Sequence, residues 1–401
     1  MLQDKIILDI FVTESSEILH KALRHIAEII SLTAVMLFND GGREVMSQEL
    51  NYPARWKENF RNVLPLFHKD TVTVRFLGDV MMHQRQIENA CKGGKEYDFS
   101  SYFKYLEEDI READLAVANM EFTLGGEPYT GYPAFSAPDG IAGYMADCGV
   151  DIFLTANNHI CDKGRAGTER TIGIYREMGS KHGISFTGIA SDEDEREDNH
   201  PLIRVVKGIR IAFVNMTYAT NGGKRTGWPK INYLDDQDDM ETALEMAESK
   251  ADVTIALPHW GEEYELLPSV EQRAKAGFLI EAGADLIIGA HPHVVQPIER
   301  ISDVQTAYSL GNAVSNMSAR NTRIGLMVTA RIVRDGAGNI SILELEPEFL
   351  WCSLPWNFAA EYTVLPVRDF IGRRDLWMNK ADYDNMVATY ERVKEITEIT
   401  D

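Results

Sequence analysis

Short apolar runs alternate with stretches of helical spacing along the middle of this chain. Apolar runs typical of strands lie at 72–77, 114–118, 151–154, 253–257 and 286–288, and apolar residues recur at helical spacing in 102–111, 138–148, 168–182, 241–251 and 272–282. After residue 304 the pattern changes, because the runs 305–310, 326–333 and 340–345 follow one another without a helical stretch. This order predicts an α/β layer followed by a second sheet.

Two further segments have distinct patterns. The runs 202–206 and 209–216 are separated by Lys207-Gly208, which predicts a hairpin. The acidic run 192–198 has no apolar residue, and we expect a solvated loop there. Calcium binding is the alternative, although the EF-hand spacing with its glycine is absent.

Both ends of the chain have helical character. We predict a helical N-terminal extension over 1–70, a central domain over 71–350 and a C-terminal helical addition over 351–401. The apolar segment 26–38 is too short for a confident membrane span, so we expect a packed or docking helix, with an internal anchor as the alternative. The first four residues lack the basic region of a secretory signal, and the compartment stays open between cytoplasm and cell envelope.

Composition narrows the function classes. The chain has 401 residues, of which 44% are hydrophobic and 25% charged, as in ordinary soluble globular proteins. Its formal net charge of −22 argues against nucleic-acid binding, which needs a basic surface. A local metal centre can dominate a distant field, so this charge does not exclude phosphate chemistry. The four cysteines form no C-x-x-C pair, which argues against a zinc ribbon.

Metal-ligating side chains recur just after the predicted strands. His291 and His293 follow the run 286–288, His259 follows 253–257, His159 follows 151–154, and Asp79 follows 72–77. The carboxyl ends of parallel strands meet at one edge of a sheet, and imidazole is the commonest nitrogen ligand of transition metals. Each motif alone is also typical of a turn, a hydrogen-bonded loop or a helix cap. Their joint position favours a metal site.

The same motifs, taken in order, resemble a known family. They are Gly78-Asp79-Val80-Met81, Asn119-Met120-Glu121, Ala156-Asn157-Asn158-His159 with Asp162, His259-Trp260-Gly261-Glu262-Glu263-Tyr264, Gly289-Ala290-His291-Pro292-His293 and Tyr308-Ser309-Leu310-Gly311-Asn312. This set resembles the calcineurin-like metallophosphoesterase superfamily, and within it the CapA family of capsule and poly-γ-glutamate synthesis proteins. The resemblance covers roughly residues 72–350.

The resemblance implies a four-layer αββα sandwich and a role for each matched residue. Asp79 would ligate a first metal, and Glu121 stands where the superfamily has a bridging carboxylate. Asn158, His259 and His291 would ligate a second metal, and His293 would ligate the first. His159 would contact the substrate or protonate its leaving oxygen, with Asp162 orienting the imidazole. The implied cofactors are one or two divalent ions, with Mn, Fe, Zn and Mg all open.

Two departures weaken the first metal position. Phosphoesterases of the superfamily carry a histidine two residues after the first aspartate, where this chain has Met81. Glu121 stands in place of the usual aspartate. His83 is a candidate replacement ligand, with an ordinary residue at a helix start as the equal alternative.

Two functional hypotheses follow. The first is a metal-dependent hydrolase of the phosphoesterase type, acting on an anionic or phosphate-containing substrate. The alternative is a non-catalytic factor in cell-envelope polymer assembly or export, with a degenerate metal site and the poly-γ-glutamate or capsule machinery as its partner. In either case, association with a membrane would occur through partners or through the N-terminal segment.

Overall fold

The computed structural model of the chain describes residues 70–221 and 227–400. The predicted N-terminal extension, including the segment 26–38, lies outside these residues apart from Asp70. Among the described residues, no helix has both the length and the apolar character needed to cross a bilayer.

The larger sheet has the strand order β19-β18-β16-β1-β4-β5-β6, with β15 beside β1 and β17 beside β16. Strands β1, β4, β5 and β6 run parallel, whereas β16 and β18 are antiparallel to their neighbours. The strands span Thr71–Val80 (β1), Leu115–Met120 (β4), Ile152–Leu154 (β5), Ser185–Thr187 (β6), Asn312–Val314 (β15), Ile324–Arg334 (β16), Ile340–Ile342 (β17), Glu346–Ser353 (β18) and Thr363–Pro366 (β19).

The smaller sheet has the order β13-β14-β12-β11-β9-β8. Its strands β9, β11, β12 and β14 are parallel, and β8 and β13 are antiparallel edges. The strands span Leu202–Val206 (β8), Ile209–Thr217 (β9), Val253–His259 (β11), Leu286–Ile288 (β12), Ile298–Ile301 (β13) and Val304–Ala307 (β14). Two short pairs complete the described strands: Cys91–Gly93 (β2) with Glu96–Tyr97 (β3), and Ile189–Ala190 (β7) with Lys230–Ile231 (β10).

An apolar layer fills the space between the two sheets. In β1, successive side chains point to opposite faces, and Val74 and Phe76 belong to the buried cluster that also holds Phe213 of β9 and Ile255 of β11. Burial of such side chains is the main stabilising contribution, at roughly 25 cal/mol per Å² of apolar surface.

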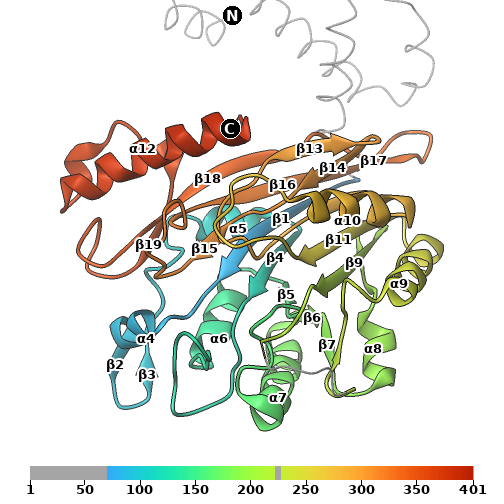
Figure 1. Ribbon diagram of the computed structural model, residues 1–401, viewed down its shortest axis with the longest axis horizontal. Helices are drawn as coiled ribbons and strands as arrows, with labels where there is room; N and C mark the ends of the chain where they lie inside the picture. Colours follow the sequence, from blue (N-terminus) through green and yellow to red (C-terminus); the bar gives the residue numbers. More distant parts are fainter. Residues whose placement is uncertain (1–69, 222–226, 401) are drawn as a thin grey trace, which may run out of the picture. The chain divides into compact units, whose positions relative to one another are not determined.

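Helices cover the outer face of each sheet (Figure 1). Helices α6 (Gly140–Asp147) and α7 (Gly164–His182) contribute Met145 and Tyr175 to a cluster on the larger sheet, and α9 (Gln237–Lys250) and α10 (Val270–Glu281) contribute Leu244 and Leu279 to a cluster on the smaller one. The other described helices are α4 (Gln84–Ala90), α5 (Glu107–Glu112), α8 (Glu193–Asn199), α11 (Val367–Phe370), η3 (Arg374–Leu376) and α12 (Lys380–Thr397). The prediction of a mixed α/β fold with two sheets is therefore confirmed.

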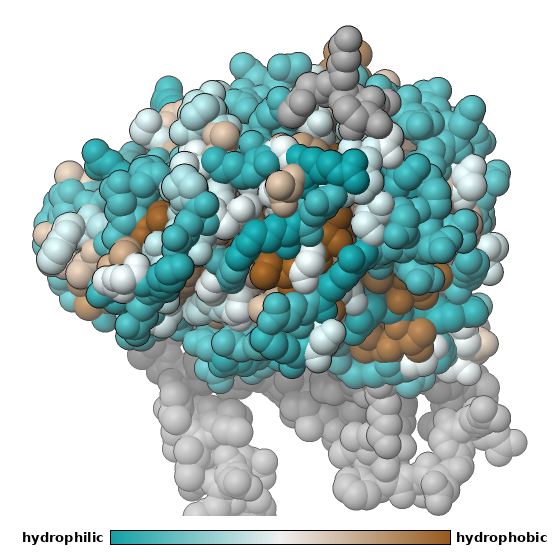
Figure 2. Space-filling view, turned by 90° about the horizontal axis from the view of Figure 1, so that it is seen from below, coloured by the Kyte–Doolittle hydropathy of each residue, from teal (hydrophilic) through white to brown (hydrophobic). Residues whose placement is uncertain are grey.

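The face of the molecule in Figure 2 is mostly hydrophilic, with hydrophobic residues gathered in recesses between polar ones. This surface fits a chain with a quarter of its residues charged.

The predicted hairpin is present as β8 and β9, which pair from Leu202 with Phe213 to Val206 with Ile209. The prediction of a loop over 192–198 is wrong, because residues Glu193–Asn199 form helix α8 and Asp192 is its N-cap residue. A side-chain oxygen of Asp192 accepts a hydrogen bond from the backbone N–H of Glu195 at 2.9 Å, and the acidic first turn suits the positive end of the helix dipole. The helix buries none of its residues, so it has no apolar face that a sequence pattern would show.

The C-terminal segment contributes to the core. Strand β19 pairs with β18, and Met386 and Val393 of α12 belong to the same buried cluster as the apolar layer between the sheets. The domain boundaries at 70 and 350 stay predictions.

Candidate metal centre

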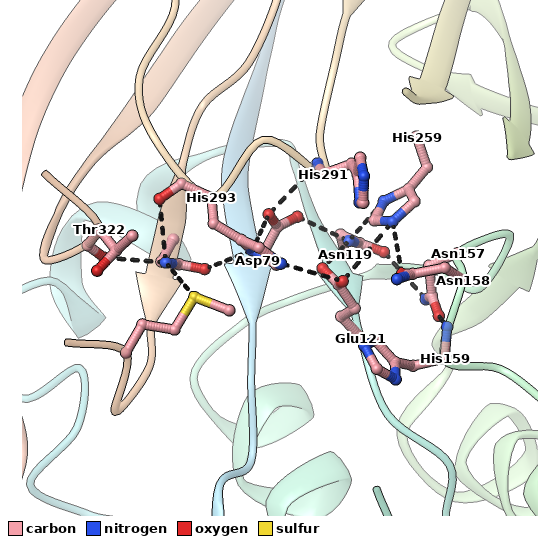
Figure 3. Close-up of polar contacts among 12 residues, drawn as sticks. Asp79, Asn119, Glu121, Asn157, Asn158, His159, His259, His291, His293 and Thr322 are labelled. Carbon is pink, nitrogen blue, oxygen red and sulfur yellow. Dashed lines mark hydrogen bonds and ion pairs between the residues drawn. The ribbon is translucent and has the colours of Figure 1, made fainter. Parts of the chain in front are cut away.

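Polar side chains from both sheets meet where the parallel strands end (Figure 3). The larger sheet supplies Asp79 from the end of β1, Glu121 directly after β4, and Asn158 after β5. The smaller sheet supplies His259 from the end of β11, and His291 and His293 from the loop after β12. All of these side chains are buried.

A close backbone approach positions Asp79. Its N–H donates to the carbonyl oxygen of Gly311 at 2.9 Å. A Cβ atom on the preceding residue, Gly78, would lie 2.0 Å from that same oxygen, so only glycine permits this approach. Strand β1 is thereby held against the segment that leads into β15.

The Asn119 side chain, at the end of β4, joins the two buried carboxylates. Its Nδ2 donates to Oδ1 of Asp79 at 2.7 Å and lies 3.2 Å from Oε2 of Glu121. Its Oδ1 accepts from Nδ2 of Asn157 at 3.2 Å. The amide therefore neutralises none of the negative charge but fixes the position of both carboxylates.

His259 lies between the two sheets. Its Nε2 is 2.9 Å from Oδ1 of Asn158 and 3.6 Å from Oε1 of Glu121. Two ligand atoms about 2.1 Å from one ion lie roughly 3.0–3.4 Å apart in tetrahedral or octahedral coordination. These separations are therefore close to those of neighbouring ligands around one ion.

His293 has two acceptors at one ring nitrogen. Its Nδ1 lies 3.1 Å from Oδ2 of Asp79 and 3.0 Å from Oδ1 of Asn312. We infer from these two oxygens that Nδ1 carries the proton. The Nε2 atom, 3.6 Å from Oε1 of Glu121, then has a lone pair available for a metal.

His291 has an uncommon backbone conformation. Its φ is 100°, and that of His293 is 57°, in the region that side chains with a Cβ rarely adopt. Such strain, of order 1–3 kcal/mol per residue, is typical of functional sites.

The Nδ1 atom of His291 is buried and has no hydrogen-bond partner among the described residues, and the centroid of the His291 ring is 4.7 Å from that of His259. Burial, with a contribution from His293, lowers the pKa of His291 to about 3, so this imidazole is neutral.

Charge in the cluster is unbalanced. Burial is the main cause that raises the pKa of Glu121 well above its usual value, and Asp79 adds to the rise. Within 70–221 and 227–400, neither carboxylate forms an ion pair with lysine or arginine, and Oε1 of Glu121 has no hydrogen-bond partner. Isolated buried charge is costly, and a divalent cation would offset it. The donor set therefore fits a metal ion.

Three groups of described side chains have ligand atoms within 4.8 Å of one another: Glu121 with His259 and His291, Asp79 with Glu121 and His293, and Glu263 with His291 and His293. Glu121 belongs to the first two groups, and His291 and His293 each belong to two. The exposed Glu263 is a candidate ligand that our sequence analysis did not select.

The pair His159 and Asp162 lies beside this cluster. Nδ1 of His159 is 2.7 Å from Oδ2 of Asp162, and the backbone N–H of Phe135 donates to that same oxygen at 2.8 Å. The ring of Phe135 packs edge-on against the imidazole at 4.6 Å. The imidazole is thus held by a carboxylate on one side and an aromatic ring on another.

Met81 and His83 lie outside the three groups. Met81 is fully buried in the apolar cluster on the larger sheet. His83 is the N-cap residue of α4, and its Nδ1 lies 3.1 Å from Oε1 of Gln86 and accepts from the backbone N–H of Asn316 at 3.3 Å. The structure thus gives His83 a capping position, in keeping with the helix-start alternative.

The cluster opens to the surface at a cavity of about 530 Å³, whose walls include His291, Tyr218, Glu263 and Tyr264. The Tyr218 ring lies 4.7 Å from that of His291. Burial raises the pKa of both tyrosines to about 12, so both are neutral at physiological pH. Of the six buried ligand candidates, His291 is the one that lines this cavity.

Comparison with known proteins identifies the family. The profile of the bacterial capsule synthesis protein PGA_cap matches residues 73–317, which is more than half of the chain. The chain therefore belongs to this family of bacterial capsule synthesis proteins, and the predicted resemblance to CapA proteins is confirmed at that level.

Two curated relatives are similar over most of their length. The capsule biosynthesis protein CapA of Bacillus anthracis is 26% identical over 335 residues, covering 80% of this chain and 76% of that protein. The PGA biosynthesis protein CapA of Bacillus subtilis (strain 168) is 26% identical over 291 residues, covering 70% and 73%.

Solved structures show weaker similarity. A putative 5'-nucleotidase from Staphylococcus aureus is 14% identical, with a TM-score of 0.48 over 69% of this chain and 54% of that one. The NAD nucleotidase of Haemophilus influenzae is also 14% identical, with a TM-score of 0.40 over 81% and 67%.

Proposed function

We propose that this protein is a metal-dependent hydrolase of the calcineurin-like phosphoesterase type that acts in capsule or poly-γ-glutamate biosynthesis. The observation that carries the proposal is a pair of buried ligand atoms without hydrogen-bond partners, Oε1 of Glu121 and Nδ1 of His291, in a cluster whose two carboxylates form no ion pair with lysine or arginine among the described residues. Buried polar atoms without a partner are uncommon in folded proteins, and an ion bound between these two would satisfy both. The proposal includes the four-layer αββα architecture of that superfamily.

The residues that would hold metal fall into two overlapping sets. Asp79, Glu121 and His293 form one, and Glu121, Asn158, His259 and His291 form the other. When bound, one or two divalent ions supply Lewis-acid polarisation of a substrate oxygen. The mixed nitrogen and oxygen donors suit Mn, Fe or Zn, and Mg with fewer of the imidazoles.

His159 is proposed as the group that exchanges a proton with the leaving oxygen, and Asp162 as the residue that orients it. The carboxylate accepts from Nδ1–H, which keeps the ring in one rotation and leaves Nε2 as the nitrogen for proton transfer. The packed ring of Phe135 excludes water from one side of the imidazole.

An assay of phosphoester and amide hydrolysis tests the proposal. Purified protein supplied with Mn, Zn or Mg is incubated with an aryl phosphate monoester, an aryl phosphodiester and oligo-γ-glutamate, and His291→Ala is run beside it. Hydrolysis that depends on metal and on His291 supports the proposal. A protein that keeps its metal but cleaves none of these compounds contradicts it.

The alternative is a non-catalytic assembly factor whose metal site only binds an anionic polymer. Met81 favours it, because a fully buried core side chain stands where a metal-ligating histidine would be expected. This alternative predicts metal-dependent binding of the polymer without cleavage, which separates it from the hydrolase in the same assay.

A further inference from the structure

A second cavity, of about 300 Å³, lies between the loop 317–323, the end of β18 and helix α12. None of the residues of the candidate metal centre lines it. Its walls include three arginines, Arg320, Arg323 and Arg392, and three apolar side chains, Met317, Trp351 and Leu354. In a chain with a net charge of −22, three guanidinium groups around one small cavity are unexpected.

One of the three charges is already matched. Nη1 of Arg323 lies 2.6 Å from Oδ1 of the buried Asp382. The other carboxylate oxygen, Oδ2, accepts from the indole N–H of Trp351 at 3.2 Å. Both carboxylate oxygens of Asp382 thus have partners, and its negative charge offsets the positive charge of Arg323 only.

The other two charges have no acidic partner in the described part of the chain. Arg392 donates to the neutral amide oxygen of Asn321, from Nε at 3.1 Å and from Nη2 at 2.7 Å. Arg320 is exposed and takes part in none of the ion pairs among these residues. Partial burial lowers the pKa of Arg392, and repulsion from Arg320 adds to the effect. Two neighbouring positive charges therefore lack a counter-charge.

Arg323 also keeps a donor free. Its Nη2 is buried and has no hydrogen-bond partner, and its guanidinium lies 4.3 Å from the centre of a Trp351 ring. Stacking on the Trp351 indole fixes the orientation of the Arg323 guanidinium. Nε donates to the carbonyl oxygen of Cys352 at 3.0 Å and Nη1 pairs with Asp382, so Arg323 is a fixed part of the cavity wall and has no pair of donors left for a carboxylate.

We propose that this cavity binds an acidic aliphatic ligand through its carboxylates. Arg320 and Arg392 would contact the oxygens, and Met317, Trp351 and Leu354 would contact the carbon chain. A volume of about 300 Å³ is at the small end of ligand sites, so it suits a glutamyl-sized unit better than a nucleotide. The ligand could be a free dicarboxylate or one unit of an acidic chain. This site is independent of the hydrolase activity proposed above.

One side chain, Asn312, contacts both the candidate metal centre and the loop that lines the cavity, and Figure 3 draws its contacts with Thr322 and His293. Nδ2 of Asn312 donates to the carbonyl oxygen of Thr322 at 2.9 Å and lies 3.6 Å from Sδ of Met317, while its Oδ1 is 3.0 Å from Nδ1 of His293. The loop that carries Arg320 and Arg323 therefore also positions the Asn312 side chain, which contacts the candidate metal ligand His293.

Calorimetric titration of metal-depleted, desalted full-length protein tests the proposal. The metal is removed so that the carboxylate probes cannot bind to an ion at the candidate metal centre. The probes are glutarate, tri-γ-glutamate, the neutral glutaramide and inorganic phosphate. The variants are R320Q and R320Q/R392Q, with R300Q/R374Q as the matched control, since Arg300 and Arg374 are exposed arginines in ion pairs elsewhere. R320Q alone is informative, because the wild-type side chain forms no ion pair or hydrogen bond with another residue of 70–221 or 227–400.

We expect glutarate or tri-γ-glutamate to bind and glutaramide not to bind. R320Q should weaken binding about tenfold or more, and the double variant further, because each variant removes charge-assisted hydrogen bonds to the ligand. Tighter binding of the trimer would identify an acidic chain as the ligand, and equal affinities a free dicarboxylate. Absence of carboxylate binding, binding of phosphate alone, or an equal loss in R300Q/R374Q would overturn the proposal.

Discussion

Nδ1 of His159 lies 2.7 Å from Oδ2 of Asp162, and the carboxylate is itself held by the backbone N–H of Phe135. The two residues are three positions apart in the chain, at the start of the segment that leads into α7. A histidine anchored in this way has one ring nitrogen committed to the protein and the other available to a substrate.

If His159 exchanges a proton with the leaving group, His159→Ala should lower metal-dependent hydrolysis by roughly 10²–10⁴-fold. Metal content should stay at the wild-type level, because His159 is outside the groups of ligand atoms. Activity at saturating metal and elemental analysis of the same sample give both readouts. Full activity of His159→Ala would show that another group supplies the proton.

His291→Ala should lose most of the bound metal, because His291 belongs to two of the three groups of ligand atoms and its Nδ1 has no competing partner. The measurement is metal content per chain after dialysis against a limiting metal concentration. His182→Ala is the control, since His182 is an exposed histidine at the end of α7. Equal metal content in the two variants would contradict the ligand assignment.

Glu121→Gln should make the metal-free protein more stable while it weakens metal binding. Burial and the neighbouring Asp79 raise the pKa of Glu121, so folding at pH 7 must either bury its charge or protonate it, and a neutral amide should raise the free energy of unfolding by about 1–3 kcal/mol. Urea unfolding of metal-depleted protein measures the gain, with Glu112→Gln, at an exposed position, as the control. A less stable metal-free Glu121→Gln protein would mean that the carboxylate has a stabilising partner.

Asp239 gives a prediction of pH dependence outside the centre. Burial opposes its ionisation, but His200, whose Nε2 lies 3.7 Å from Oδ2 of Asp239, and Arg196, which donates a hydrogen bond to the same oxygen, outweigh burial and lower the pKa of Asp239 from 3.8 to about 2. A lowered folded-state pKa contributes stability above the unfolded-state value, and this contribution is lost as the pH falls toward 2. At pH 7 it amounts to about 2 kcal/mol, given 1.36 kcal/mol per pKa unit.

Asp239→Asn should therefore lower the free energy of unfolding at pH 7 and have a shrinking effect as the pH falls from about 4 to 2. Urea unfolding across this range is the measurement. Asp238→Asn, one position away and exposed in the same helix, serves as the control. A pH-independent difference would show that Asp239 acts by packing and not by its charge.

The strand ends were predictable because the signal is local. An apolar run followed by Asp, Asn or His marks each of β1, β4, β5 and β11, and parallel strands bring their ends to one edge. The close contacts were not predictable, because they depend on pairs far apart in sequence. Nothing near Asn119 indicates that its amide contacts Asp79, which lies 40 positions away.

Glu263 and α8 show two other limits. Glu263 lies in an exposed loop among several acidic residues, so its proximity to His291 and His293 depends on the path of the chain and not on its composition. The helix α8 has no buried residue, and periodicity reports only those helices that pack an apolar face.

The candidate ligands are divided between two sheets, with Asp79, Glu121 and Asn158 on one and His259, His291 and His293 on the other. The distance between these two halves is consequently set by the thickness of the apolar layer that separates the sheets. Close-packed interiors respond to changes of even one methylene group. The volumes of side chains such as Phe76 and Ile255 therefore determine how far apart the two sets of candidate ligands lie. A change of volume in that layer would alter the size of the ion that the candidate centre could accept, without touching any of the candidate ligands.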